Sequence, residues 1–154
     1  MKDKRIRLQQ GMKPSFHADD WITLTVASDN RLLALVRHVA QTAAELAGIS
    51  RRAAYDVALA VNEACSNVIE HAYEGQEGSP LTLSCRIVED GLELRVRDEG
   101  KPFDFSAVPD LPPEEIREGG RGVFLIRRLM DDVASSPLEG GGTELRMFKR
   151  RSPL

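Results

Sequence analysis

The chain has 154 residues, the usual size of one domain, and its 21 Lys and Arg against 24 Asp and Glu give a formal net charge of −3. That balance argues against direct nucleic-acid binding, which normally shows a basic excess, and no stretch approaches the ~20 apolar residues that span a membrane. The two cysteines, Cys65 and Cys85, each lie in an apolar segment, which indicates buried free thiols in a reducing compartment and a cytoplasmic protein.

The first half of the chain predicts an arm, a strand and two helices. Residues 1–18 mix charged residues with a glycine and a proline and show little periodicity, so we expect a flexible arm. In residues 21–27 isoleucine, leucine and valine alternate with threonine, the period of a half-buried strand. A helix follows with its apolar stripe over 32–47, Gly48 ends it, and a second helix covers roughly 50–73.

The middle of the chain predicts a hairpin and a long loop. The runs 81–88 and 92–97 alternate apolar and polar residues and are joined by Glu89-Asp90-Gly91, which indicates a β-hairpin. Residues 99–120 then hold proline, glycine and acidic residues without a clear period. A loop of that length inside a compact domain is usually a functional lid or a disordered segment.

The rest of the chain predicts one more helix and one more strand. The helix begins near Gly122 and keeps one apolar face through Val133, and after a glycine cluster the final strand covers 143–149. The order strand, helix, helix, strand, strand, lid, helix, strand gives an α+β fold. We expect a two-layer sandwich over residues 19–150, with helices on one face of a mixed, mostly antiparallel sheet.

Glu63 and Asn67 are one helical turn apart in the second predicted helix, so their side chains point to the same side of it. A carboxylate there can act as a general base or orient a nucleophile, and a carboxamide oxygen can ligate Mg²⁺. Each residue taken by itself is also compatible with a solvated helix surface. His71 continues the same side and can line a site, although a structural hydrogen bond is the interpretation that we favour.

Asp98 ends the second strand of the predicted hairpin and is followed by a glycine at position 100. A carboxylate at a strand end can accept a hydrogen bond from the exocyclic amine of adenine, whereas guanine presents a carbonyl there. Gly100 leaves room for a flat base to lie against the backbone, and Phe103 can anchor the loop in the core. Thr143, at the start of the last strand, is a second candidate adenine contact. The alternative is a plain turn.

Gly119, Gly120, Arg121 and Gly122 open the third predicted helix. Free backbone N–H groups and the helix dipole at such a start attract a polyphosphate, and Arg121 can contact a terminal phosphate. A flexible lid hinge is the alternative, and both interpretations can hold together. The chain has no P-loop motif and no dinucleotide-binding fingerprint.

Four motifs together resemble the nucleotide-binding boxes of the Bergerat (GHKL) ATPase superfamily, whose members include histidine kinases and type II topoisomerases. They are ExxxN ahead of HAY, then DEGKPFD, then GGRGVFLIRRLMDDV and finally GGTEL, and they span about residues 57 to 148. Within that superfamily, PFD and RGVFLIRRLMDDV resemble the bacterial anti-sigma factor serine-protein kinases of partner-switching systems.

The resemblance implies a Bergerat ATP-binding fold that uses ATP and Mg²⁺, with residues 105–118 as the ATP lid. It implies that Glu63 is the catalytic base for a serine hydroxyl and that Asn67 holds Mg²⁺. The ATP-binding residues that it implies, together with those argued above, are Asn67, Asp98, Gly100, Phe103, Gly120, Arg121, Gly122 and Thr143.

The implied partners are a STAS-domain anti-anti-sigma factor, which carries the substrate serine, and a sigma factor that competes with it. The resemblance also implies a homodimer. Two other functions stay open: a non-catalytic, ATP-dependent binding module of the same fold, and a detached histidine-kinase ATPase domain. Against the second, we find no helical dimerisation segment with a phospho-accepting histidine ahead of the domain.

Overall fold

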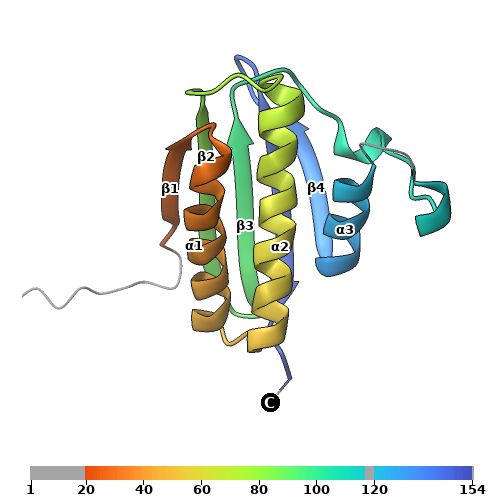
Figure 1. Ribbon diagram of the computed structural model, residues 1–154. Coiled ribbons are helices and arrows are strands. Elements are labelled where there is room, and N and C mark those ends of the chain that lie inside the picture. Colours follow the sequence, from red (N-terminus) through yellow and green to blue (C-terminus); the bar gives the residue numbers. More distant parts are fainter. Residues whose placement is uncertain (1–19, 117–119, 154) are drawn as a thin grey trace, which may run out of the picture.

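The computed structural model describes residues 20–116 and 120–153 (Figure 1), so the predicted arm at 1–18 lies outside the described residues. Within them the chain forms a five-stranded sheet with helices on one face (Figure 1). The elements, in chain order, are β1 (Ile22–Ala27), α1 (Leu33–Leu46), α2 (Arg51–Asn67), β2 (Pro80–Val88), β3 (Gly91–Asp98), α3 (Arg121–Leu129), β4 (Asp132–Pro137) and β5 (Thr143–Arg150). The predicted α+β two-layer sandwich is confirmed.

The strands lie in the order β1-β2-β3-β5-β4, and each neighbouring pair is antiparallel. Within the described residues the sheet is thus fully antiparallel, and the sequence predicts a mixed, mostly antiparallel one. The predicted hairpin joins β2 to β3 through Glu89 and Asp90, with Val88 paired to Gly91. The last strand, β5, lies between β3 and β4, so that β3 is the central strand and β1 and β4 form the two edges of the sheet.

Polar side chains cap the 3₁₀ turn that leads into α1 and the first turn of α2. Asp29 accepts a hydrogen bond from the backbone N–H of Arg31 (2.8 Å) in the turn before α1. Ser50 accepts one from the N–H of Ala53 (3.2 Å) at the start of α2. Among the described residues, no helix has the length and apolar character that crossing a membrane requires.

The segment after α3 differs from the prediction of a helix that continues through Val133. The helix ends at Leu129, and Asp132–Pro137 forms strand β4. Met130 already has extended dihedral angles, and Val133 pairs with Met147 of β5. The apolar pattern of this short segment is too weak to fix its structure. Pairing with β5 satisfies its backbone hydrogen-bonding groups, so the tertiary context decides between helix and strand here.

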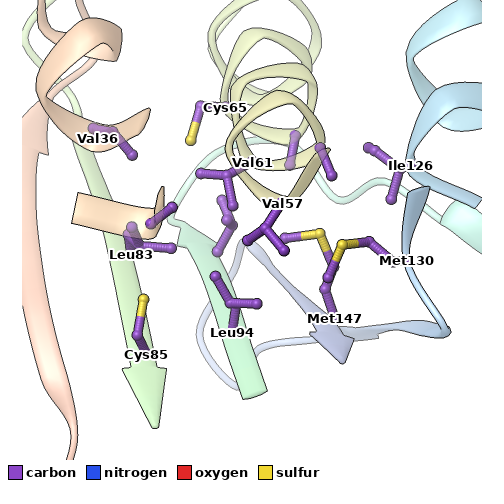
Figure 2. Packing of buried hydrophobic residues seen from close by; sticks show 14 of the residues in the cluster. Val36, Val57, Val61, Cys65, Leu83, Cys85, Leu94, Ile126, Met130 and Met147 are labelled. Carbon is purple, nitrogen blue, oxygen red and sulfur yellow. The ribbon is translucent and has the colours of Figure 1, made fainter. Parts of the chain in front are cut away.

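The hydrophobic core lies between the sheet and the helix layer (Figure 2). α2 lies between α1 and α3 (Figure 1), and most of its buried side chains are alanines, which let the neighbouring helices approach closely. Figure 2 shows Val57 and Val61 of α2 opposite Leu83, Leu94 and Met147 of the sheet. Removal of these apolar side chains from water is the main stabilising contribution to the fold.

Cys65 and Cys85 are fully buried in this core, and both are free thiols, as the sequence predicts. Burial raises the pKa of each thiol to about 12. Both therefore stay protonated at neutral pH and act as small apolar side chains.

The sheet face opposite the helices carries charged side chains that pair with one another. Glu93 of β3 is 6% exposed and binds Arg86 (2.8 Å), Arg95 (2.9 Å) and Arg146 (3.4 Å). Trp21 lies against the cluster, with the guanidinium carbons of Arg86 and Arg95 4.7 and 4.5 Å from its ring centroid. Burial acts to raise the pKa of Glu93, but the hydrogen bonds from Arg86 and Arg95 outweigh it and hold that pKa below its ordinary value.

Glu93→Gln is expected to lower the free energy of unfolding by about 2 kcal/mol at neutral pH, because three arginines lose their ion pairs with this carboxylate. The folded-state pKa of Glu93 is lowered, so its stabilisation is complete above the unfolded-state pKa and is lost as the pH falls through the folded value. Urea unfolding curves of wild type and variant should therefore converge in acid. Glu89→Gln, in the exposed hairpin turn, is the control, and a constant gap across the pH range would contradict the assignment.

Candidate active site

α2 ends at Asn67, and the chain continues as a π-helical turn, Val68–Ala72. The predicted helix over 50–73 is right in extent, but its hydrogen bonding changes after Asn67. The backbone N–H of Tyr73 donates to the carbonyl oxygen of Val68, five residues back (3.0 Å). Widened turns of this kind are rare and often lie at functional sites.

The beginning of α3 lies against the polar side of α2. A Cβ atom at Gly122 would lie 3.1 Å from Glu63 Oε2 and 3.2 Å from both terminal atoms of the Asn67 carboxamide. Glu63 and Asn67 are half-buried and thus face the same helix start, as their spacing predicts. Gly120 is the N-cap of α3, and Arg121 is its exposed first residue.

Asp98 is the last residue of β3 and is 4% exposed. Its carboxylate accepts hydrogen bonds from the backbone N–H of Gly100 (2.9 Å) and from the backbone N–H of Thr143. Burial raises the pKa of Asp98, and these two N–H donors oppose the rise without cancelling it. The backbone of two separate segments therefore fixes the position of this carboxylate.

A pocket lies between the end of α2, the sheet and the segment after β3. Its walls are mostly apolar, and four predicted site residues, Asn67, Asp98, Phe103 and Thr143, line it together. The other lining residues are Ala64, Val68, Ala72, Val96, Phe105, Ser135 and Leu145. A few convergent polar groups in an apolar pocket are typical of small-molecule sites. Since Asn67 also faces Gly122, the pocket adjoins the helix start.

Gly100 is required by a close approach of the chain to itself. A Cβ atom there would lie 2.4 Å from the carbonyl oxygen of Ala72 and 2.9 Å from a ring atom of Tyr73. The same carbonyl accepts the N–H of Lys101 (2.9 Å). Gly100 therefore shapes the pocket through Ala72, which lines it, and room for a flat base beside Gly100 stays a prediction.

Phe103 and Thr143 are joined by a hydrogen bond across the loop. The backbone N–H of Phe103 donates to Thr143 Oγ1 (3.1 Å). His71 is exposed, and its ring stacks on that of Phe103 with the centroids 6.4 Å apart. His71 thus packs against the loop that bears Phe103.

Three residues that hold one wall of the pocket in place, Phe105, Ser135 and Arg127, are not predicted from the sequence. Phe105 and Ser135 line it, and the N–H of Phe105 donates to Ser135 Oγ (3.1 Å). Ser135 belongs to β4, the strand that sequence reasoning misses. Arg127 of α3 donates to the carbonyl oxygens of Phe105 and Val108. Phe105, two residues after Phe103, is the one that a search for loop anchors could have found.

The sandwich and the site together define a class of protein, the ATP-binding domains of the Bergerat type. A buried carboxylate at a strand end and a glycine-started helix against a Glu/Asn pair suit the two ends of a nucleotide. Comparison with known proteins agrees: the family described as "Histidine kinase-like ATPase domain" matches residues 26–149. The chain belongs to this family, which confirms the resemblance seen in the sequence.

Curated relatives carry the name Serine-protein kinase RsbW. The relative from Halalkalibacterium halodurans is 35% identical over 86% of this chain and 85% of its own. Those from Listeria innocua and Bacillus subtilis are 38% and 32% identical over 74% of this chain, and over 78% and 76% of their own. Among solved structures, the SiaB-SiaC complex from Pseudomonas aeruginosa matches with a TM-score of 0.64 and 18% identity, over 82% of this chain and 87% of that one. At that identity the likeness supports the fold.

Gly100→Ala is expected to destabilise the protein by about 2 kcal/mol, because the new Cβ would meet the carbonyl oxygen of Ala72 in the π-helical turn. Gly122→Ala is the matched control, since its Cβ would meet the movable ends of two side chains and alanine favours a helix. Thermal unfolding should show a clear fall in Tm for Gly100→Ala and little change for Gly122→Ala. Equal Tm values would contradict the packing role of Gly100.

Proposed function

We propose that this chain is an ATP-dependent serine-protein kinase of the anti-sigma factor type, with residues 19–150 as its ATP-binding domain. The observation that carries the proposal is the closeness of Gly122 to the side chains of both Glu63 and Asn67, next to the Asp98 pocket. Phosphoryl transfer requires mainly positioning and electrostatic stabilisation, and these groups can supply both. The name of the curated relatives supports the same reaction.

We assign the pocket to the adenine ring of ATP. Its apolar walls, among them Phe103, suit a flat heterocycle, and the carboxylate of Asp98 can accept a hydrogen bond from the exocyclic amine. Guanine would present a carbonyl oxygen to the same carboxylate and would be repelled. Thr143, which is 6% exposed, is the second polar contact for the base.

The side-chain oxygen atoms at the end of α2 are of the kind that Mg²⁺ binds. Within the described part of the chain, neither Glu63 nor Asn67 has a side-chain hydrogen bond or ion pair, so their oxygens are available to a ligand. Asn67 would hold the cation through its carboxamide oxygen, and phosphate oxygens and water usually complete such a site. When bound, the cation neutralises negative charge on the phosphates.

Glu63 acts as the general base in this proposal. Its carboxylate takes the proton of the substrate serine as the hydroxyl oxygen attacks the γ-phosphorus, and ADP leaves. Gly120 and Gly122 keep the start of α3 open to phosphates, and Arg121 is free to contact the terminal one. Residues 105–118 form the ATP lid; of these the structure describes 105–116, and 109–115 are exposed.

The substrate serine lies, in our proposal, on a STAS-domain anti-anti-sigma factor, and a sigma factor competes with that partner for a homodimeric kinase. These partners follow from the resemblance to anti-sigma factor kinases. The buried free thiols agree with a cytoplasmic site of action. A non-catalytic ATP-dependent module is the alternative function, and the position of Glu63 against Gly122 favours the enzyme.

Glu63→Gln is expected to lower the rate of phosphoserine formation by about 10²–10⁴-fold while ATP still binds, because the general base is lost and the adenine pocket is intact. The measurement uses purified protein, labelled ATP, Mg²⁺ and the STAS-domain protein encoded beside its gene. Asp56→Asn, two turns earlier on the same face of α2, is the control and should leave the rate unchanged. Tight ATP binding by wild type without transfer to any STAS-domain protein would instead favour the non-catalytic module.

Asp98→Asn is expected to weaken ATP binding about tenfold or more, because the adenine amine loses a charged acceptor. Since the pKa of Asp98 is raised, wild-type affinity should fall as the pH drops toward that value, at a less acidic pH than for an ordinary aspartate. The variant should lack this pH dependence. Isothermal titration calorimetry across the acid range measures both effects, and an unchanged affinity at neutral pH would refute the adenine assignment.

A further inference from the structure

Arg127 connects α3 to residues 103–108, the segment after the Asp98 loop, which we call the lid root. Its Nη2 atom donates to the carbonyl oxygens of Phe105 (3.1 Å) and Val108 (2.7 Å). Its guanidinium carbon lies 4.9 Å from the centroid of the Phe105 ring, within cation–π range. One side chain on a core-packed helix thus makes three contacts with this short segment.

The lid root is also attached to the sheet. The N–H of Phe105 donates to Ser135 Oγ of β4, and the N–H of Phe103 donates to Thr143 Oγ1 of β5, both at 3.1 Å. Its regular structure is one 3₁₀ turn, Phe105–Ala107, which is too short to be stable by itself. These contacts with α3, β4 and β5 therefore set its position.

The position of the lid root matters because Phe105 is a wall of the pocket. Phe105 is 4% exposed and lines the pocket together with Asp98. Arg127 and Gly122 lie near opposite ends of α3, a helix of nine residues. The same helix thus contacts the pocket wall near its end and lies close to Glu63 at its beginning.

We propose that Arg127 is a positioning residue that locks the Phe105 wall to α3, so that the base pocket and the helix start keep one geometry. This inference rests on the proposed function, because it treats the pocket as the adenine site. Without Arg127, the carbonyl groups of Phe105 and Val108 lose their charged donor, and the wall must be ordered when the nucleotide binds. The loss falls on nucleotide affinity and not on the transfer step, since Glu63 keeps its surroundings.

The test is a titration of the full chain with MANT-ADP, which needs the base pocket but brings no γ-phosphate, together with steady-state phosphotransfer. Arg127→Gln is expected to raise the Kd for MANT-ADP about tenfold, as for the loss of hydrogen bonds from a charged donor. The KM for ATP should rise by a similar factor, while kcat stays within about twofold of the wild-type value. Arg127→Lys, which restores the charge without the planar fork, should lie between. Arg128→Gln is the matched control: Arg128 is the exposed neighbour that stacks on Phe124 at 5.6 Å, and its loss should change neither value.

Hydrogen–deuterium exchange gives a second readout that a general loss of stability would not reproduce. Amides of residues 105–108 should exchange faster in Arg127→Gln, while those of α1 keep their wild-type rates. Ser135→Ala removes the contact from β4 and should accelerate the same amides. If Arg127→Gln does not fold, Arg127→Lys and Ser135→Ala carry the test.

Wild-type Kd and wild-type exchange at 105–108 in these variants would overturn the inference. A fall in kcat at unchanged KM would also overturn it, because Arg127 would then serve the transfer step. Wild-type protein that binds no MANT-ADP would refute the proposed function, and this inference with it. A wild type that binds MANT-ADP beside an equally tight Arg127→Gln refutes the inference and leaves the proposed function intact.

Discussion

The burial of the Asp98 carboxylate is the constraint on which the site depends. At 4% exposure the carboxylate has lost most of its water, and backbone donors from the turn after β3 and from the start of β5 replace part of it. Gly142, with φ +90°, comes so close that a Cβ atom would lie 1.9 Å from the Asp98 carbonyl oxygen. The raised pKa shows that these donors do not fully offset burial. A carboxylate in that condition gains strongly from one further donor, which is what an adenine amine supplies.

The other end of the site depends on the crowding around α2. Because that helix packs between α1, α3 and the sheet, its polar side chains after Tyr55 are only half-exposed. Asn62 faces α1 and accepts a hydrogen bond from Arg37 (2.9 Å). Glu63 and Asn67 instead face the start of α3, where Gly122 has no side chain to oppose them. Asn67 belongs to both regions, because it lines the Asp98 pocket and faces the helix start. It is therefore the residue through which the two ends of a nucleotide would meet the same helix.

The sequence predicts those parts of the fold and site whose signals are local. The alternation in 21–27, the Glu89-Asp90 hairpin and the spacing of Glu63 and Asn67 each depend on residues close together in the chain. Strand β4 is different, since its few apolar positions also fit a helix and its identity depends on pairing with β5. Gly100 signals a turn, but the group that fills the space beside it is the carbonyl of Ala72, which no local pattern identifies. For the same reason the contacts of Ser135 and Arg127 with Phe105 appear first in three dimensions.

The elements around the site are stabilised by different contacts: the hydrophobic core holds α3, and α3 holds the lid root. A helix of nine residues is too short to persist by itself, so α3 relies on its buried residues Val123 and Ile126 and on its packing against α2. Lys149 of β5 adds a hydrogen bond from its ammonium group to the carbonyl oxygen of Leu129 (2.7 Å), which fixes the end of the helix to the sheet. α3 in turn holds the lid root through Arg127. The pocket wall at Phe105 is therefore positioned by the hydrophobic core through one short helix, and a substitution that loosens α3 in the core would disturb both ends of the proposed nucleotide site at once.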